Sequence, residues 1–415
     1  MMEEKVIFYE KSTARNSSDF LKEPNLTLDE LRSKLAQDLQ VDHLNFLLGA
    51  GCSSYMEKNE KDEQWEEKSI PTMRELFKRF CKKKPDFHIG PLKSMECFDS
   101  NLEKMIESMQ AVQVVDNTIN QGLIESNAKI DDRIDSKITE VQNFICEQIK
   151  SGMVRQDIHG EITDSPVLQL YEEFYQKIAQ RSRENPINIF TTNYDLFNEM
   201  ALDNLGFPYN NGFTGTYRRK FNPLSYHYMY VENLNLHDAM WQKVSNFFNL
   251  VKIHGSISWV REGEKIIEKN YDDIKSEETV MIYPTPLKDR STLMVPYSDL
   301  FRMMENQLAL RNSLLIVIGY SFSDDHINRV IFNGFQSPSF RLVVFGDPVS
   351  NKGIGKLLEL GDSRISVIYS KGNDKIHYFK GFVEKALPDI SPDIKESVET
   401  NSSNKLIADY KGAES

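Results

Sequence analysis

Residues 44–54 read LNFLLGAGCSS, so a run of large, mostly apolar residues leads directly into Gly-Ala-Gly and two serines. The apolar run predicts a buried strand, and Gly49 and Gly51 allow another backbone to approach closely. Two explanations fit such a turn. Either it packs tightly against a neighbouring segment, or its N–H groups hold a phosphate. The rest of the chain has to decide between them.

Four further apolar runs also end in small or polar residues, and a short strand is expected at 6–9. The four runs are INIFT at 187–191, NLVKIHGS at 249–256, LLIVI at 314–318 and FRLVVFGDP at 340–348. Each is continuously apolar, as in strands that are buried on both faces of a parallel sheet. We therefore predict an α/β fold with an open, mostly parallel Rossmann-like sheet. Its strand ends should converge on one crevice.

Helical patterns occupy the segments between the runs. Thr27 and Glu30 form a capping-box pattern ahead of a helix that leads into the first strand. Apolar residues recur by threes and fours from about 102 to 149, with a break expected near Gly122 or Asn127. This pattern predicts a helical insertion at about 90–155. Its apolar face packs either on the protein's own core or on a partner.

Composition excludes several classes of protein. The 415 residues are 40% hydrophobic and 11% aromatic, enough for a packed core, and the formal charge of -12 argues against a chain-wide nucleic-acid-binding face. The four cysteines form no C-x-x-C pair, so we expect neither zinc nor another metal. The N-terminus does not resemble a signal peptide, and no apolar run is long enough to span a membrane. The sequence predicts a reduced, cytoplasmic protein.

Five short motifs then occur in an order that resembles the sirtuin family. They are Gly49-Ala50-Gly51-Cys52-Ser53, Ile70-Pro71-Thr72-Met73-Arg74, Thr191-Thr192-Asn193-Tyr194-Asp195, His254-Gly255 and Gly319-Tyr320-Ser321. The extended forms TTNYD at 191–195 and GYSFSDDHI at 319–327 look like the sirtuin-like proteins of bacterial anti-phage defence systems. The resemblance covers residues 41–350 and implies a sirtuin-type fold that binds NAD.

The sequence departs from the deacetylases of that family in three respects. The paired C-x-x-C zinc ribbon is missing, and Thr192 stands where those enzymes have Gln. In addition, Thr72 and Met73 replace an Asp-Phe pair. These changes argue against protein deacylation and leave NAD cleavage in place.

The resemblance assigns roles to three candidate catalytic residues. Asn193 is expected to order the ribose and the attacking water, because its amide offers an acceptor and two donors. His254 is expected to be a general base, since imidazole titrates near neutral pH. Asp195 either takes part directly or fixes the hydrogen bonds of its loop.

The remaining candidates would bind the substrate. The expected NAD-binding residues are Gly49, Ala50, Gly51, Ser53, Arg74, Thr191, Gly319, Ser321 and Asp347. Backbone N–H groups of 49–53 would hold the pyrophosphate, and Asp347 would accept from a ribose hydroxyl. Arg74 either pairs with phosphate or forms a surface ion pair. Asp324 and Asp325 are expected to cap a helix.

The resulting hypothesis is an NAD glycohydrolase that releases nicotinamide and ADP-ribose and depletes NAD during phage defence. The alternatives are an NAD-dependent deacylase or ADP-ribosyltransferase, and a non-catalytic sensor that binds NAD or ADP-ribose. The expected organisation is an N-terminal extension at 1–40, a catalytic domain at 41–350, and a C-terminal extension at 351–415 with a polar tail from Asp389. We expect a homo-oligomer, and the resemblance implies a HerA-type ATPase partner with no direct contact to nucleic acid or membrane.

Overall fold

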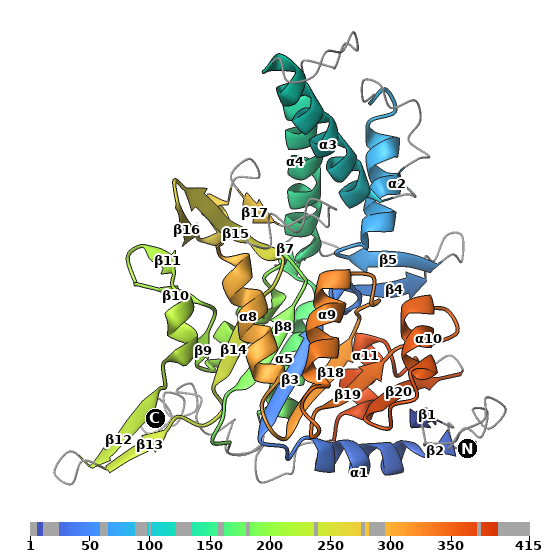
Figure 1. Cartoon of the computed structure of the whole chain (residues 1–415), viewed down its shortest axis with the longest axis vertical. Coiled ribbons are helices and arrows are strands. Elements are labelled where there is room, and N and C mark those ends of the chain that lie inside the picture. The colour runs from blue at the N-terminus through green and yellow to red at the C-terminus, as the bar shows by residue number, and fades with distance from the viewer. Residues whose placement is uncertain are drawn as a thin grey trace, which may run out of the picture.

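The computed structural model describes residues 6–10, 25–58, 65–87, 98, 101–121, 134–156, 162–179, 183–235, 240–274, 279–281, 295–371 and 375–388. The expected helix break near 122–127 and the polar tail from 389 lie outside these residues. Figure 1 shows a central sheet with helices on both faces and a group of helices that projects from one end.

Nine strands of the described chain form the main sheet. In order across the sheet they are β2 (Asn25–Leu26), β1 (Val6–Glu10), β20 (Ile365–Ser370), β19 (Arg341–Phe345), β18 (Ser313–Ile318), β3 (His43–Leu48), β8 (Ile187–Thr191), β14 (Phe248–Lys252) and β9 (Tyr209–Asn210). The seven strands from β20 to β9 run parallel, and β1 joins them antiparallel. The predicted α/β fold with a mostly parallel sheet is confirmed.

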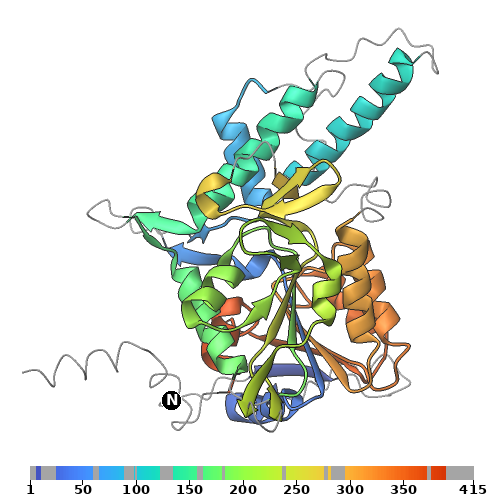
Figure 2. The same cartoon turned by 90° about the vertical axis from the view of Figure 1, so that its left-hand side faces the viewer.

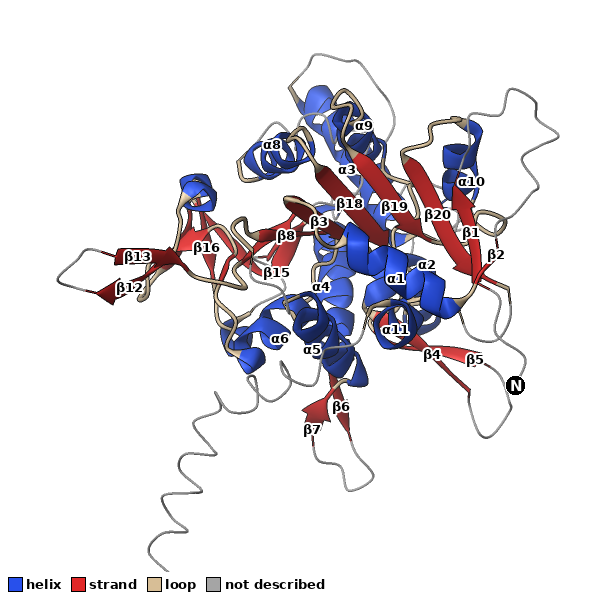
Figure 3. Ribbon diagram, turned by 90° about the horizontal axis from the view of Figure 1, so that it is seen from below, coloured by secondary structure: helices blue, strands red, loops and turns tan. Residues whose placement is uncertain are grey.

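Both faces of the sheet are covered, which explains why its strands are continuously apolar. Along β18, Leu314 and Ile316 point into one core cluster, whereas Leu315 points into a second cluster on the opposite face. The first cluster lies under α1 (Leu28–Asp38), α5 (Pro166–Ile178) and α11 (Phe379–Gly381). The second lies under α8 (Tyr297–Leu308), α9 (Asp325–Gly334) and α10 (Lys352–Glu359). Figure 3 shows these two layers from below.

A ladder of buried amides sets the register of the strands that carry the site. Asn188 Nδ2 donates to Asn45 Oδ1 at 2.9 Å, and Asn249 Nδ2 donates to Asn188 Oδ1 at 2.9 Å. These residues are paired across β3, β8 and β14. A one-residue slip would leave buried amides unsatisfied, so the ladder fixes which residues follow each strand end.

The strand order reverses between β3 and β18. From β3 the chain continues to β8 and β14 on one side, and it later returns to fill β18, β19 and β20 on the other. The turns that follow β3 and β18 therefore lie side by side at the carboxyl edge of the sheet. In open α/β sheets this switch point is where ligands bind.

Three strands of the main sheet were not predicted from the sequence: the two-residue strands β2 and β9, and the longer β20. β20 lies in the region expected to be a C-terminal extension, and it pairs parallel with β19 and antiparallel with β1. Ser366 interrupts its apolar run, and this serine is buried in the structure. The strand β20 therefore lacks the continuous apolar pattern that revealed β3, β8, β14, β18 and β19.

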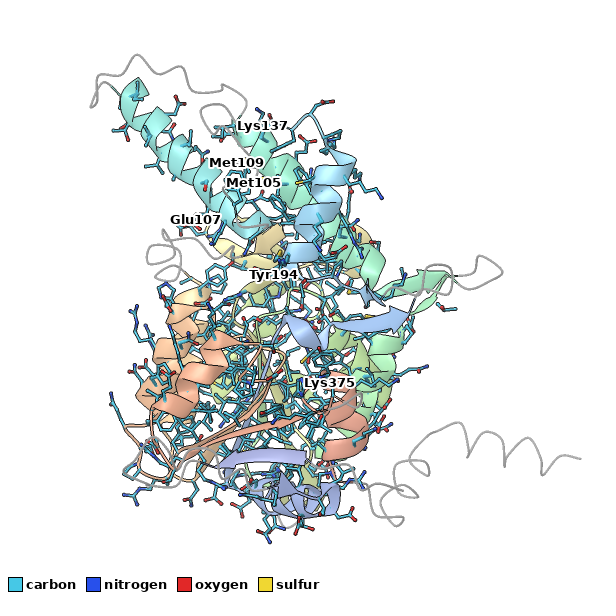
Figure 4. All side chains as sticks on the ribbon, turned by 90° about the vertical axis from the view of Figure 1, so that its right-hand side faces the viewer. Met105, Glu107, Met109, Lys137, Tyr194 and Lys375 are labelled. Atoms are coloured by element: carbon cyan, nitrogen blue, oxygen red, sulfur yellow. The ribbon has the colours of Figure 1, made fainter. Side chains whose placement is uncertain are left out.

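The projecting helices form what we call the helical arm: α2 (Met73–Lys83), α3 (Leu102–Asn120) and α4 (Ile134–Gly152). The arm stands beyond the carboxyl edge of the sheet in both views of Figures 1 and 2. Its apolar residues are continuous with the first core cluster and include Met105, Met109 and Ile145. Figure 4 labels Met105 and Met109 between the helices. Packing on the protein's own core therefore accounts for much of the apolar periodicity.

A smaller sheet and three hairpins complete the described fold. The smaller sheet contains β10 (Phe213–Thr214), β11 (Arg219–Phe221), β16 (Lys265–Glu268), β15 (Gly255–Glu262) and β17 (Thr279–Met281). The hairpins pair β4 (Ser54–Lys58) with β5 (Trp65–Ser69), β6 (Val154–Gln156) with β7 (Ile162–Asp164), and β12 (Val231–Asn235) with β13 (Met240–Lys243). The helix α6 (Phe197–Leu205) follows β8. None of the described helices is long and apolar enough to cross a membrane.

Candidate active site

A cavity of about 470 Å³ opens at the switch point, where the turns after β3, β8, β14 and β18 meet the base of the helical arm. Its size suits a small-molecule ligand. Its lining brings together Ala50, Gly51, Ser53, Arg74, Asn193, Asp195, His254, Gly319 and Ser321 from the sequence-predicted set. The arm contributes Leu76 and Ile149, and Asn101 lies directly before α3; the sequence did not suggest these three residues. Figure 4 labels Tyr194, another lining residue, where the arm meets the sheet.

The glycines of the turn after β3 allow close contact between two backbones. A Cβ atom on Gly49 would lie 2.4 Å from the carbonyl oxygen of Gly319, and one on Gly51 would lie 3.0 Å from Gly319 Cα. Gly319 itself has φ +69°, a left-handed conformation that favours glycine. Tight packing therefore explains the Gly-Ala-Gly pattern.

Most backbone N–H groups of this turn already donate hydrogen bonds within the protein. The sequence predicted that they would be available to a phosphate. Gly49 N donates to Ile318 O, Gly51 N to Gly319 O, Cys52 N to Gly49 O and Ser53 N to Ala50 O. An N–H group that already donates to a carbonyl is a poor anion donor. Ala50 belongs to the same turn and lines the cavity. An anion in this cavity would depend chiefly on side chains.

Asn193 is held by its amide nitrogen. Its Nδ2 donates to Gly49 O at 3.0 Å and to Ser53 Oγ at 2.8 Å, and its side chain is 5% exposed. Both amide protons are thereby used, so Oδ1 is the atom that can accept from a ligand. Thr191 also holds the backbone of Asn193, because Thr191 Oγ1 accepts a hydrogen bond from Asn193 N at 3.0 Å. Thr191 is fully buried and does not line the cavity.

Asp195 is buried two residues after Asn193 and also lines the cavity. Its Oδ2 accepts from Ser53 Oγ at 2.6 Å, and its Oδ1 accepts from Phe197 N at 3.1 Å. Burial raises the pKa of the Asp195 carboxyl above its ordinary value, and the ammonium of Lys252 opposes that rise. Lys252 donates to the Asp195 carbonyl oxygen and to Glu199 Oε1. Asp195 therefore fixes its loop and, through Ser53, the position of Asn193.

His254 follows β14 at the cavity wall and is 7% exposed. Its Nε2 lies 3.1 Å from Asp324 Oδ2, and its ring centroid lies 6.3 Å from that of Tyr194. Asp324 also accepts from His326 N at 3.0 Å and so caps α9, as the sequence predicted. The contact with His254 was not predicted, because the two residues are 70 positions apart.

Arg74 and Asp347 were both predicted to bind the substrate, but only Arg74 lines the cavity. Arg74 is exposed at the start of α2 and lines the cavity, so its guanidinium is available to an anion there. Asp347 does not line the cavity, although it follows β19. Its Oδ1 accepts from Val349 N at 2.9 Å, which organises its own turn. Hydrogen bonds from Val349 and Ser350 lower the pKa of Asp347 despite partial burial.

Metal-binding residues do not gather within the described part of the chain, where no three His, Cys, Asp or Glu side chains are arranged to hold an ion. Cys52 and Cys146 are buried, and burial raises the pKa of both thiols. Cys97 lies outside the described residues.

Comparison with known families gives one match. Residues 187–338 match the model of the SIR2-like domain family, a range that runs from β8 to just beyond α9. It contains Asn193, Asp195, His254 and Asp324 but not the turn after β3 or Arg74. No curated protein matches the chain. The match supports a sirtuin-like relationship, and because SIR2-like domains bind NAD it supports an NAD-related activity.

Proposed function

We propose that this chain is an NAD glycohydrolase that transfers the ADP-ribosyl group of NAD to water. The observation that carries the proposal is the placement of Asn193 and His254 in one cavity, at the switch point of a parallel sheet with a SIR2-like domain. Arg74, on the arm side of the same cavity, supplies a cation for the pyrophosphate. This role replaces the amide cradle that the sequence suggested.

The reaction needs an acceptor and a base beside the ribose. The bond between C1′ and nicotinamide breaks, and its electron pair leaves with nicotinamide. The oxygen of water forms the new bond to C1′, and the proton of that water passes to His254. Asn193 Oδ1 accepts from the water or from a ribose hydroxyl and so orients it. Both side chains are held by neighbouring groups before the substrate arrives.

The biological role and the partners form a second part of the proposal. Unrestrained NAD hydrolysis would kill the cell, so we propose that the enzyme acts in anti-phage defence and is restrained until triggered. We propose further that it assembles as a homo-oligomer with a HerA-type ATPase. Within the apolar pattern of 102–149, Ile134 and Ile145 are buried in the protein's own core, so we do not propose them for assembly. Val114 and Val115 are exposed on α3 and are the better candidates.

The acceptor distinguishes this function from its alternatives. NAD is incubated with the purified chain, with and without an acetyl-lysine peptide, and the products are separated by chromatography. A glycohydrolase yields equimolar nicotinamide and ADP-ribose without peptide. Product that appears only with peptide indicates a deacylase, and transfer of ADP-ribose to protein indicates a transferase. Binding without product indicates a sensor.

A further inference from the structure

Asp324 contacts His254 from a different part of the chain. The 3.1 Å separation between His254 Nε2 and Asp324 Oδ2 joins two side chains that are each less than 10% exposed. Each oxygen of the carboxylate has its own partner, because Oδ1 accepts the His326 amide at the start of α9. One side chain thus links the imidazole to the first turn of a helix.

We infer that Asp324 is the positioning residue of His254: it fixes the ring and stabilises the imidazolium that forms when His254 takes up a proton. The catalytic part of this inference rests on the function proposed above. An ionised carboxylate can only accept hydrogen bonds, so Nε2 must carry the proton in this pair. The other ring nitrogen is then the one that accepts a proton, and the adjacent negative charge favours its protonation.

Hydrogen bonds among its own residues and α9 hold the loop that carries Asp324. The Tyr320 hydroxyl lies 3.1 Å from Asp324 O and 3.0 Å from Asn328 Oδ1, and it shares its proton between them. Asn328 Nδ2 in turn donates to Phe322 O at 3.0 Å. These hydrogen bonds connect Asp324 both to the loop before it, through Tyr320, and to α9 after it, through Asn328.

Phe322 shows that this loop is held in a conformation it would not adopt freely. Its φ of +56° is in the left-handed region, and its side chain is buried. A bulky residue there persists only when its surroundings impose it. Such strain is common where a loop must place a functional side chain, which agrees with a positioning role for Asp324.

Other charged groups also face the cavity and bear on the titration of His254. The titratable residues that line it with His254 are Arg74, Tyr194, Asp195, Tyr320 and Asp324. The carboxylate of Asp195 accepts hydrogen bonds from Ser53 and from the Phe197 amide. Arg74 lines the cavity from the helical arm. Burial raises the pKa of Tyr320, so its hydroxyl stays neutral. Asp324 supplies a carboxylate at hydrogen-bond distance from the imidazole.

Two neighbouring aspartates supply a matched pair of variants. Asp324→Asn removes the charge but keeps an oxygen for the helix cap, because asparagine is as good an N-cap as aspartate. Asp325→Asn removes the same charge one residue later, at an exposed position that does not line the cavity. Any general effect of charge at the start of α9 should appear in both variants.

The experiment has a readout that does not depend on catalysis. Histidine labelled with ¹³C at Cε1 is followed by NMR through a pH titration, and the His254 signal is assigned by its loss in His254→Gln. We expect the imidazole of Asp324→Asn to titrate about one pH unit lower than in the wild type, and that of Asp325→Asn to titrate as in the wild type. An unchanged titration in Asp324→Asn overturns the inference, as does an equal shift in both variants.

Nicotinamide release is measured on the same proteins. We expect Asp324→Asn to lower kcat about 10- to 100-fold and to move the acidic limb of the pH profile to lower pH, while Asp325→Asn stays within about twofold of the wild type. Wild-type kinetics in Asp324→Asn contradict the positioning role. If the wild type releases no nicotinamide, the proposed function fails, and the NMR titration still decides whether Asp324 governs His254.

Discussion

Asn193 and Asp195 are hydrogen-bonded to the same hydroxyl group, that of Ser53. Ser53 Oγ accepts from Asn193 Nδ2 at 2.8 Å and donates to Asp195 Oδ2 at 2.6 Å. A residue of the turn after β3 therefore connects two residues of the turn after β8. The turn that first suggested a phosphate site acts here as a support for the Asn193 amide.

We predict that Ser53→Ala lowers the rate of NAD cleavage about tenfold or more, since Asn193 loses one of its two anchors and a small misplacement of an orienting group is costly. Ser54→Ala is the control, because Ser54 is the next residue and does not line the cavity. Steady-state nicotinamide release is measured for both. If Ser53→Ala cleaves NAD as fast as Ser54→Ala, the hydrogen bond between Ser53 and Asn193 does not contribute to catalysis.

The second prediction concerns stability and pH. Burial raises the pKa of Asp195, so the folded protein binds this proton more tightly than the unfolded chain. Its contribution to the free energy of unfolding is complete below the unfolded value of about 3.9 and is lost as pH rises through the raised folded value. Asp195→Asn lacks this dependence. Urea unfolding at a series of pH values from about 7.5 down toward the unfolded value should therefore show the wild type gaining stability relative to the variant as pH falls. A difference that stays constant or changes the other way would contradict the assignment.

Gly319 provides a test of the backbone contact. Gly319→Ala places a Cβ atom 2.8 Å from Cys52 N, in addition to the cost of φ +69°. Gly263→Ala is the matched control, since Gly263 has φ +60° and no atom within 4 Å of the added Cβ. We expect Gly263→Ala to lower the free energy of unfolding by about 1 kcal/mol, and Gly319→Ala to lower it by about 1–3 kcal/mol more. Equal losses in denaturant unfolding would mean that the close approach does not matter.

The sequence predicted the fold where the physical signal was local. The strands β3, β8, β14, β18 and β19 are buried on both faces, so each is a short apolar run that ends in small or polar residues. The Thr27–Glu30 capping box is likewise a local signal, and both of its hydrogen bonds form. The strand β20 was missed because its run contains Ser366, which is buried only through its neighbours in the sheet.

The candidate site was harder to predict because its contacts are not local. A sequence shows that Asn193 and His254 follow strands, but not that Ser53 holds the former or that Asp324 contacts the latter. The occupied amides at 49–53 depend on the chain returning through β18. The arm residues Leu76 and Ile149 reach the cavity only through packing of the helical arm, which no local motif records.

We also predict that the activity does not need zinc. The described cysteines lie apart and offer no tetrahedral set. Dialysis against a zinc chelator should leave both the far-ultraviolet circular dichroism spectrum and nicotinamide release unchanged. Stoichiometric zinc by elemental analysis, with activity lost to the chelator and restored by added zinc, would overturn this expectation.

The most direct test of catalysis by Asn193 and His254 is to measure nicotinamide release from NAD. The proteins compared are the wild type, Asn193→Ala, His254→Ala and the control His227→Ala. His227 is an exposed histidine that does not line the cavity. We predict that the wild type and His227→Ala release nicotinamide with equimolar ADP-ribose, and that the other two variants are slower by about 10²–10⁴-fold with native circular dichroism spectra. Folded Asn193→Ala or His254→Ala protein that cleaves NAD at the wild-type rate would contradict the assignment of this cavity as the catalytic site.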